Sequence, residues 1–277
     1  MNTYSQALLV SANPLKEKLY TSEAHFNEKY IAANKIKAIE ASISVKYDLQ
    51  QIRETGRSNY FSFNTLGKIS NHYEVYGNDT IATYYEYNTK NQLIVKRTND
   101  RQGFYSHNYE YNNSDKLIRY YYSRDENEFA DKHRFKLSNR NIILSENYEY
   151  GISSKNQVTR TIINDIGKPY KEETFNYDQF GNLAEYIYRY IITGNQVATA
   201  YSYDFYSRIV EIVKPEETIL FEYDSIGNLT AEKVYKNNSL YQTKEFLYNN
   251  AMLLTAQLIK NEETKAITII KFTYIYY

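Results

Sequence analysis

The chain has 277 residues, of which 33 are Tyr and none is Cys or Trp, and its 33 basic residues balance 33 acidic ones. The formal charge of zero gives no support for electrostatic binding to nucleic acid or to an anionic membrane. The absence of Cys excludes disulfides and thiolate metal sites and leaves the redox compartment open. No stretch approaches the roughly 20 apolar residues of a membrane helix. The Tyr content favours a thin sheet with half-buried rings over a thick apolar core.

The first 40 residues predict a unit separate from the rest of the chain. Residues 1–21, which include Pro14, show no clear period and predict an irregular lead. A Ser or Thr cap followed by acidic residues then predicts a helix over about residues 22–36. We expect this helix to pack on and cap the first strand of a sheet, since an open sheet edge invites unwanted pairing. The sequence thus divides into residues 1–40 and a β-repeat sheet over residues 41–277.

A short motif recurs along most of the chain. It has an aromatic residue, any residue, Tyr, then Asp or Asn, and an aliphatic residue six places after the Tyr. The copies follow one another at intervals of mostly about 20–26 residues, which is the period of a repeat architecture. The eight copies are Phe61/Phe63/Asn64/Ile69, Tyr85/Tyr87/Asn88/Leu93, Tyr109/Tyr111/Asn112/Leu117, Phe135/Leu137/Ser138/Ile143, Phe175/Tyr177/Asp178/Leu183, Tyr201/Tyr203/Asp204/Ile209, Phe221/Tyr223/Asp224/Leu229 and Phe246/Tyr248/Asn249/Leu254.

The chemistry of the motif predicts a tight β-hairpin. Asp or Asn at the start of a turn folds its side chain back onto the backbone, and the residue three places later must tolerate a left-handed conformation. Such a turn makes a bulge and brings the Tyr opposite the aliphatic residue, so Tyr223 should face Leu229 and Tyr177 should face Leu183. The left-handed position holds Gly67, Asn91, Asp115, Asn141, Gly181 and Gly227 in six copies, and the exceptions Ser207 and Met252 in the other two.

The motif resembles a known repeat. The sequence Tyr-Asp-x-x-Gly-Asn-Leu at Tyr177–Leu183 and Tyr223–Leu229 is similar to the YD repeat, also called the Rhs repeat. The resemblance covers about residues 60–254 and is close at these two copies and degenerate at the others. In that family, such units build long antiparallel sheets in bacterial Rhs and ABC-toxin shells and in teneurins. No segment here matches the Pro- and Asp-containing segment that closes Rhs shells, so the resemblance implies the sheet and carries over no catalytic residue.

One interval between motif copies is longer than the others. Between Ser138 and Asp178 lie turn signals at residues 151–156 and at residues 164–168. These would make three strands where a regular array needs two. If both are full reversals, the first three motif turns should lie at one edge of the sheet and the last four at the other.

The polar residues favour structural roles over chemistry. The histidines are far apart, and none has a His or Cys at metal-ligand spacing. The turn Asp residues are explained as turn initiators, and neither a Gly-x-Ser-x-Gly elbow nor a phosphate-binding Gly loop occurs. We therefore expect no enzyme and no catalytic, cofactor or metal site. The residues considered as possible metal or catalytic groups are His25, His72, His107, His133, Asp178, Asp204 and Asp224.

The Tyr-rich strands supply a candidate binding face. Their rings could form a flat platform for carbohydrate, or they could form cross-strand ladders that hold a single-layer sheet together. The ladder is the favoured interpretation, with an exposed remainder that could serve a partner. The candidate residues are Tyr84, Tyr85, Tyr87, Tyr109, Tyr111, Tyr120, Tyr121 and Tyr122.

The last strand raises a membrane alternative. Thr268–Tyr277 has alternating aromatic residues and ends in one, as the closing strand of an outer-membrane barrel does. Against this, Leu183–Arg189 and Leu229–Val234 carry charges where a lipid-facing band should be apolar.

The sequence predicts an all-β protein, an elongated antiparallel meander of about 15–18 strands in a curved or partly wrapped single layer, with a short N-terminal helix. The predicted function is a non-enzymatic scaffold that binds or bridges another protein of the cell envelope, with no cofactor, nucleic acid or membrane span. The alternatives are a carbohydrate-binding module, an Rhs-like shell fragment linked to toxin export, and an outer-membrane β-barrel. Met1–Ala12 is a poor signal peptide, so we expect either a cytoplasmic chain or a mature form whose signal was removed. The resemblance favours the second, in the periplasm, at the cell surface or secreted.

Overall fold

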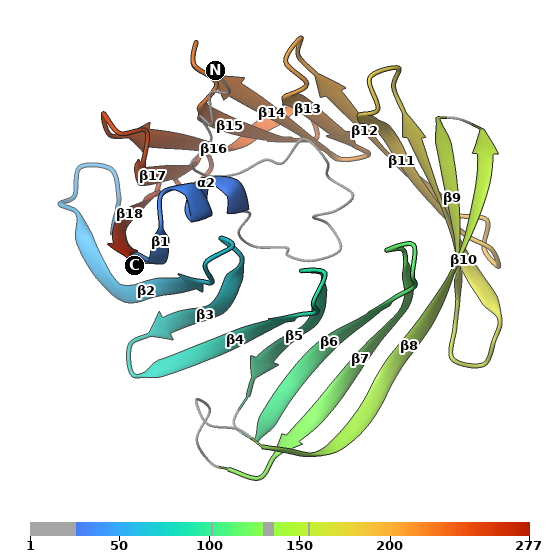
Figure 1. Cartoon of the computed structure of the whole chain (residues 1–277). Helices are drawn as coiled ribbons and strands as arrows, with labels where there is room; N and C mark the ends of the chain where they lie inside the picture. Colours follow the sequence, from blue (N-terminus) through green and yellow to red (C-terminus); the bar gives the residue numbers. More distant parts are fainter. Residues whose placement is uncertain (1–25, 101, 130–135, 155) are drawn as a thin grey trace. The chain divides into compact units, whose positions relative to one another are not determined.

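Strands account for nearly all of the chain that the structure describes. The computed structural model describes residues 26–100, 102–129, 136–154 and 156–277 (Figure 1). The predicted lead of residues 1–21, together with His25, His133 and Phe135, lies outside these residues. The helix and the eighteen strands within them are α2 (Glu28–Ala33), β1 (Ile36–Lys46), β2 (Arg53–Phe63), β3 (Ile69–Tyr76), β4 (Asp79–Tyr87), β5 (Leu93–Asn99), β6 (Gly103–Tyr111), β7 (Leu117–Asn127), β8 (Leu137–Ser154), β9 (Gln157–Ile163), β10 (Pro169–Tyr177), β11 (Leu183–Tyr190), β12 (Gln196–Tyr203), β13 (Ile209–Lys214), β14 (Glu217–Tyr223), β15 (Leu229–Lys236), β16 (Ser239–Tyr248), β17 (Leu254–Asn261) and β18 (Ile267–Tyr276).

The predicted all-β class is confirmed, but the predicted curved or partly wrapped layer does not have its first and last strands as free edges. Consecutive strands pair antiparallel from β5 to β11 and from β12 to β18, and β1 pairs with both β2 and β18. Figure 1 shows β1 between these two strands. The first strand is therefore paired along both sides and joins the last strand of the chain. An open meander would leave the backbone groups of these two strands exposed at its edges.

The chain divides into two compact units, Met1–Thr80 with Ala200–Tyr277 (unit 1) and Ile81–Thr199 (unit 2). In unit 1, Tyr30 and Ile31 of α2 pack on Ile39 of β1 and on Phe61 and Phe63 of β2. Unit 2 contains β5 to β11 and most of β4. Polar side chains form much of its buried interior, and these are described with the candidate site.

The helix does not cap a sheet edge as predicted. Asn27 is the N-cap of α2, and its side chain accepts a hydrogen bond of 3.1 Å from the backbone N–H of Tyr30. The six residues of α2 lie within the predicted range and are followed by β1, which begins at Ile36 rather than at residue 41. Because β1 pairs on both sides, α2 covers a face of the sheet and protects no edge.

The predicted hairpins are confirmed for seven of the eight motif copies. In the clearest copy, the Asp224 side chain accepts hydrogen bonds of 3.0 Å from Ile226 N–H and 2.8 Å from Asn228 N–H. Ser207 and Met252 adopt the left-handed conformation, at φ of 58° and 61°, although neither is Gly, Asn or Asp. The ring-to-aliphatic pairs, each next to a register shift, are Phe63–Ile69, Tyr87–Leu93, Tyr111–Leu117, Tyr177–Leu183, Tyr203–Ile209, Tyr223–Leu229 and Tyr248–Leu254.

The motif Tyr residues also join successive hairpins. The hydroxyl of Tyr223 donates to the Ile209 carbonyl at 2.8 Å, and that of Tyr248 donates to the Leu229 carbonyl at 2.9 Å. Tyr111 makes the same bond to the Leu93 carbonyl at 2.9 Å. Each of these carbonyls belongs to the aliphatic residue that follows the preceding turn, where the bulge interrupts the ladder. The motif Tyr thus packs within its own hairpin and anchors the neighbouring one.

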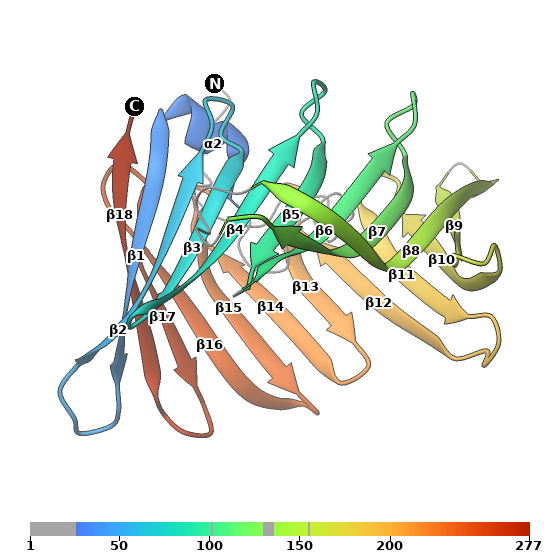
Figure 2. The same ribbon diagram turned by 90° about the horizontal axis from the view of Figure 1, so that it is seen from below.

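The predicted change of edge in the long interval is wrong. Ser138 lies inside the 18-residue strand β8, and Asn141 pairs there with Arg124. Both later reversals exist, one between Ser154 and Gln157 and one from Asn164 to Lys168. With no turn at Ser138, the motif turns after β4, β6 and β10 of unit 2 all follow strands of one direction. Figure 2 shows the turns after β4 and β6 projecting from the same end of their strands.

Two glycines of the motif have similar left-handed backbones but differ in what an added Cβ would contact. Gly181 has φ of 83° and open space where a Cβ would stand, whereas a Cβ on Gly67, with φ of 79°, would collide with the backbone carbonyl of Glu28 in α2. Gly181→Ala should therefore cost only the left-handed strain, about 1 kcal/mol, and Gly67→Ala roughly 2–4 kcal/mol. Urea denaturation followed by circular dichroism measures both. Equal losses would contradict the packing of α2 on this turn.

The hydroxyl anchor can be tested at Tyr248. Removing it in Tyr248→Phe should destabilise the protein by about 1–2 kcal/mol, because the Leu229 carbonyl loses its donor. Tyr206→Phe is the matched control, since this side chain is 74% exposed at a turn and should change stability by less than about 0.5 kcal/mol. Thermal denaturation of the two variants beside the unaltered chain provides the measurement. A Tyr248→Phe protein as stable as the control would show that the hydroxyl bond is dispensable.

Candidate binding site

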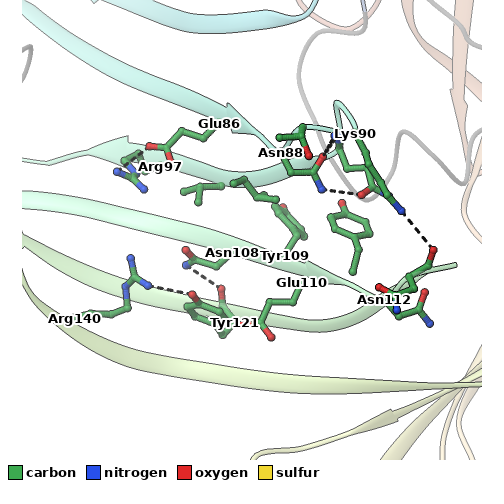
Figure 3. A pocket seen from close by; sticks show the side chains of 16 residues that line it. Glu86, Asn88, Lys90, Arg97, Asn108, Tyr109, Glu110, Asn112, Tyr121 and Arg140 are labelled. Carbon is green, nitrogen blue, oxygen red and sulfur yellow. Dashed lines mark hydrogen bonds and ion pairs between the residues drawn. The ribbon is translucent and has the colours of Figure 1, made fainter. Parts of the chain in front are cut away.

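A polar groove of about 620 Å³ lies on unit 2, along β4 to β8 and the turns after β4 and β6 (Figure 3). Its charged lining consists of Glu86, Lys90, Arg97, Glu110 and Arg140. Amide side chains and the rings of Tyr109, Tyr111 and Tyr121 complete most of the wall, and the aliphatic lining residues are Ile94 and Val95. The amides are Asn88, Gln92, Asn108, Asn112 and Asn113.

Strand register explains why these residues meet. Glu86 is opposite Val95, Val95 is opposite Asn108, and Asn108 is opposite Tyr121, so one row runs across four strands. In the next row, Arg97 is opposite Ser106. Because successive side chains on a strand point to opposite faces, residues two places apart share a face with this row. The charged lining residues of the strands therefore share this face, and Ile94 and Tyr109, from the positions between them, also line the groove.

A buried carboxylate lies beside the groove. Asp125 of β7 has no exposed surface, and it accepts hydrogen bonds from Ser106 Oγ at 2.6 Å and from Ser123 Oγ at 3.0 Å. Arg140 Nε donates to the same carboxylate at 3.0 Å, and Arg140 Nη1 donates to the Tyr121 hydroxyl at 3.0 Å. The Arg140 side chain is 41% exposed. Asp125 thus holds a guanidinium that has one side open to solvent.

A second guanidinium is more deeply buried. Arg97 of β5 is 5% exposed, and its Nη1 lies 3.1 Å from a carboxylate oxygen of the half-exposed Glu86. Burial lowers the pKa of Arg97, and the charges of Glu86 and Asp125 oppose this shift without cancelling it. The cation is therefore buried beside a carboxylate that is itself half exposed.

The eight Tyr residues that were predicted to share one face of the sheet lie on both of its faces. Tyr84 and Tyr121 have the register of the groove row, whereas Tyr85, Tyr109, Tyr120 and Tyr122 have the opposite register. Tyr87 and Tyr111 follow the register shifts at the ends of β4 and β6. The structure brings Tyr109, Tyr111 and Tyr121 together in the groove lining. The use of any of these residues for binding stays a prediction.

Rings on the opposite face form the cross-strand ladder that the sequence favours. Tyr105 stacks on Tyr122 with ring centroids 5.8 Å apart, and Tyr122 contacts His107 at 4.9 Å. His107 reaches Tyr120 at 6.0 Å, and Tyr120 contacts Tyr109 at 5.5 Å. In the stacked pairs the rings turn their faces toward one another, so these faces are used in holding β6 to β7.

The His and Asp residues considered as possible metal or catalytic groups make structural contacts. His72 Nε2 lies 3.0 Å from Asn59 Oδ1 and its ring stacks on Phe61, while His107 Nδ1 lies 2.8 Å from the Tyr120 hydroxyl. Asp178, Asp204 and Asp224 start turns, as predicted. In the described parts of the chain, no group of three or more His, Asp or Glu residues could hold a metal ion. Likewise, no helix among these residues is long and apolar enough to cross a membrane.

Sequence reasoning missed the charged part of the groove. Arg97, Asp125 and Arg140 belong to three different strands, and no short motif contains any two of them. Their meeting depends on the register of β5 to β8, which the motif does not fix for the turns between β5 and β6 or between β7 and β8. The signal that could have found them is the alternation Ser123-Arg124-Asp125, which puts a carboxylate on the same face as Tyr121.

The chain matches no family model and no curated protein. Solved structures similar to it include a porin-like protein from Bacteroides vulgatus, with 11% identity, a TM-score of 0.34, and coverage of 84% of this chain and 97% of that one. A porin-like protein from Bacteroides uniformis has 10% identity and a TM-score of 0.29, covering 87% and 98%. A LolA superfamily protein from Nitrosomonas europaea has 7% identity and a TM-score of 0.27, covering 87% and 84%. These likenesses are too low to assign a family or a function.

The buried carboxylate should be essential to the local structure. Asp125→Asn should destabilise the protein by about 2–4 kcal/mol, because Arg140 loses its counter-charge and an amide cannot accept all three hydrogen bonds. Asp115→Asn is the control, since its ion pair with Lys90 is more than half exposed on both sides and should change stability by less than about 1 kcal/mol. Urea denaturation compares the two variants. A small loss at Asp125 would mean that the polar cluster relaxes without its carboxylate.

Proposed function

We propose that the chain is a non-enzymatic β-repeat scaffold that acts outside the cytoplasm, and that it binds a component of the cell envelope in the groove of unit 2. The groove carries the proposal, because it gathers two guanidinium groups, two carboxylates and several amides on a rigid sheet. A fixed array of donors and acceptors suits recognition, since little order is lost when a ligand binds. The YD-repeat relationship is part of the proposal, supported by the turn geometry of the seven hairpins.

A carbohydrate-binding module is a second candidate within this proposal. The groove lining combines Tyr rings with planar amide and carboxylate groups, a set that can hydrogen-bond hydroxyls and contact the apolar face of a sugar. The predicted platform of eight Tyr residues is not needed for this function. Three of those residues, Tyr109, Tyr111 and Tyr121, line the groove.

The outer-membrane barrel is a third candidate, which the pairing of β1 with the last strand, β18, favours. The distribution of charge in unit 1 weighs against it. Glu222, Lys233 and Glu245 share one face of β14 to β16, opposite to the face of buried Phe221 and Phe246. Glu222 and Glu245 are exposed, and Lys233 lies 2.5 Å from Glu222. Charges in mid-strand are costly on a lipid-facing surface, so we favour an aqueous location.

The proposal can be tested with a photo-crosslinking residue at Asn113, which is exposed at the rim of the groove. The same residue placed at the exposed Asn237, in the turn between β15 and β16 of unit 1, is the control. In the native organism, we expect the protein in an extracytoplasmic fraction and a discrete adduct at residue 113 alone. Arg140→Gln should reduce that adduct, because it alters the groove without removing the crosslinker.

Two results would contradict the proposal. One is recovery of the full chain solely from the cytoplasmic fraction, and the other is the same adduct pattern at residues 113 and 237. An adduct that Arg140→Gln leaves unchanged would place the contact outside the groove.

A further inference from the structure

The chemistry of the groove differs from that of an ordinary protein-binding or drug-like pocket. Such sites have apolar centres, depleted of charge, with polar groups around the rim. Here Arg97 and Asn108 are 5% and 2% exposed, and Ile94 and Val95 are the aliphatic residues of the lining. A ligand that brings hydroxyl and charged groups matches this wall better than an apolar peptide side chain does.

The two guanidinium groups indicate that the ligand is acidic. Arg140 has five N–H donors in total, and the contacts with Asp125 and Tyr121 use two of them. Asp125 itself is fully buried and engaged by Ser106, Ser123 and Arg140, so it orients the guanidinium and cannot reach a ligand. A planar guanidinium fixed in this way can bind a carboxylate through two parallel hydrogen bonds.

The cations of the lining differ in how open they are to a ligand. Lys90 pairs with Asp115 and the buried Arg97 pairs with Glu86, whereas Arg140 is held by the buried Asp125 and is still 41% exposed. An incoming carboxylate would therefore pair with the exposed side of Arg140.

We propose that the groove binds an acidic oligosaccharide, whose carboxylate pairs with Arg140 and whose hydroxyls bond to the amides of the groove wall. This rests on the proposed function as a binding scaffold and adds the chemical class of the ligand. The Tyr121 hydroxyl, which accepts a hydrogen bond from Arg140, holds the guanidinium in place. Arg97 stabilises negative charge from its buried position beside Glu86.

Calorimetric titration of the full chain tests the proposal. The acidic probes are oligosaccharides of galacturonate, of alternating glucuronate and N-acetylglucosamine, and of sialylated lactose, and the neutral probes are galactose oligomers of the same length and lactose. At least one acidic probe should bind about tenfold or more tightly than its neutral counterpart, because only the acidic one pairs with the guanidinium. Arg140→Gln should abolish that difference.

Arg189→Gln is the matched control, because Arg189 is a half-exposed arginine of β11 paired with Glu172 and lies outside the groove lining. It should bind as the unaltered chain does. Urea denaturation of both variants identifies a loss that is due to unfolding. If Arg140→Gln unfolds, Arg140→Lys replaces it, since Lys keeps the charge, lacks the fork and should still bind about tenfold more weakly.

Several outcomes would overturn the inference. Equal binding of acidic and neutral probes would remove the role of the guanidinium, and equal binding of polyglutamate would show a general anion site. If no acidic probe binds but a groove-dependent adduct forms at residue 113, the acidic oligosaccharide is refuted and the binding scaffold is supported. If no probe binds and no adduct forms, both the acidic oligosaccharide and the binding scaffold are refuted.

Discussion

The fold depends on a turn in which a carboxylate or amide side chain replaces missing backbone hydrogen bonds. The Asp224 side chain accepts from two backbone N–H groups, and the left-handed residue Gly227 then reverses the chain with a bulge. The bulge puts Tyr223 opposite Leu229, and the same shift interrupts the ladder at the aliphatic residue. The hydroxyl of the next motif Tyr bonds to the carbonyl at that point. Turn, ring pair and inter-hairpin bond are therefore consequences of one local geometry.

Because the motif contains this geometry, most of the fold could be predicted from it. The turn succeeds even at Ser207 and Met252, where the side chain disfavours a left-handed backbone, so the initiating Asp or Asn and the ring pair outweigh that strain. The copy at Leu137 forms no turn. It has Leu in place of Tyr and Ser in place of Asp, so it lacks both the ring pair and the initiating carboxylate or amide, and β8 continues through it.

The pairing of the first strand with the last could not be predicted from the motif, because no local pattern joins them. Ile36–Lys46 pairs with Ile267–Tyr276 across nearly the whole sequence. The alternation of each strand predicts a β-conformation and says nothing about its partner. The sequence predicts that the helix caps an edge, but its Tyr30 and Ile31 side chains need an apolar face, which β1 and β2 provide. The groove was missed for the same reason, since its charges meet through register alone.

A buried charge cluster such as Asp125, Arg140 and Arg97 is not explained by stability. Desolvation of ions usually offsets their attraction, and well-packed apolar residues at such positions are often equally stable or more so. The neighbouring ladder of Tyr and His rings already joins β6 to β7 on the other face. The cluster therefore adds specificity and not strength: it fixes the direction of a guanidinium that is still partly exposed. An oriented donor in an open groove suits recognition, which is why we propose the binding role for this part of the sheet.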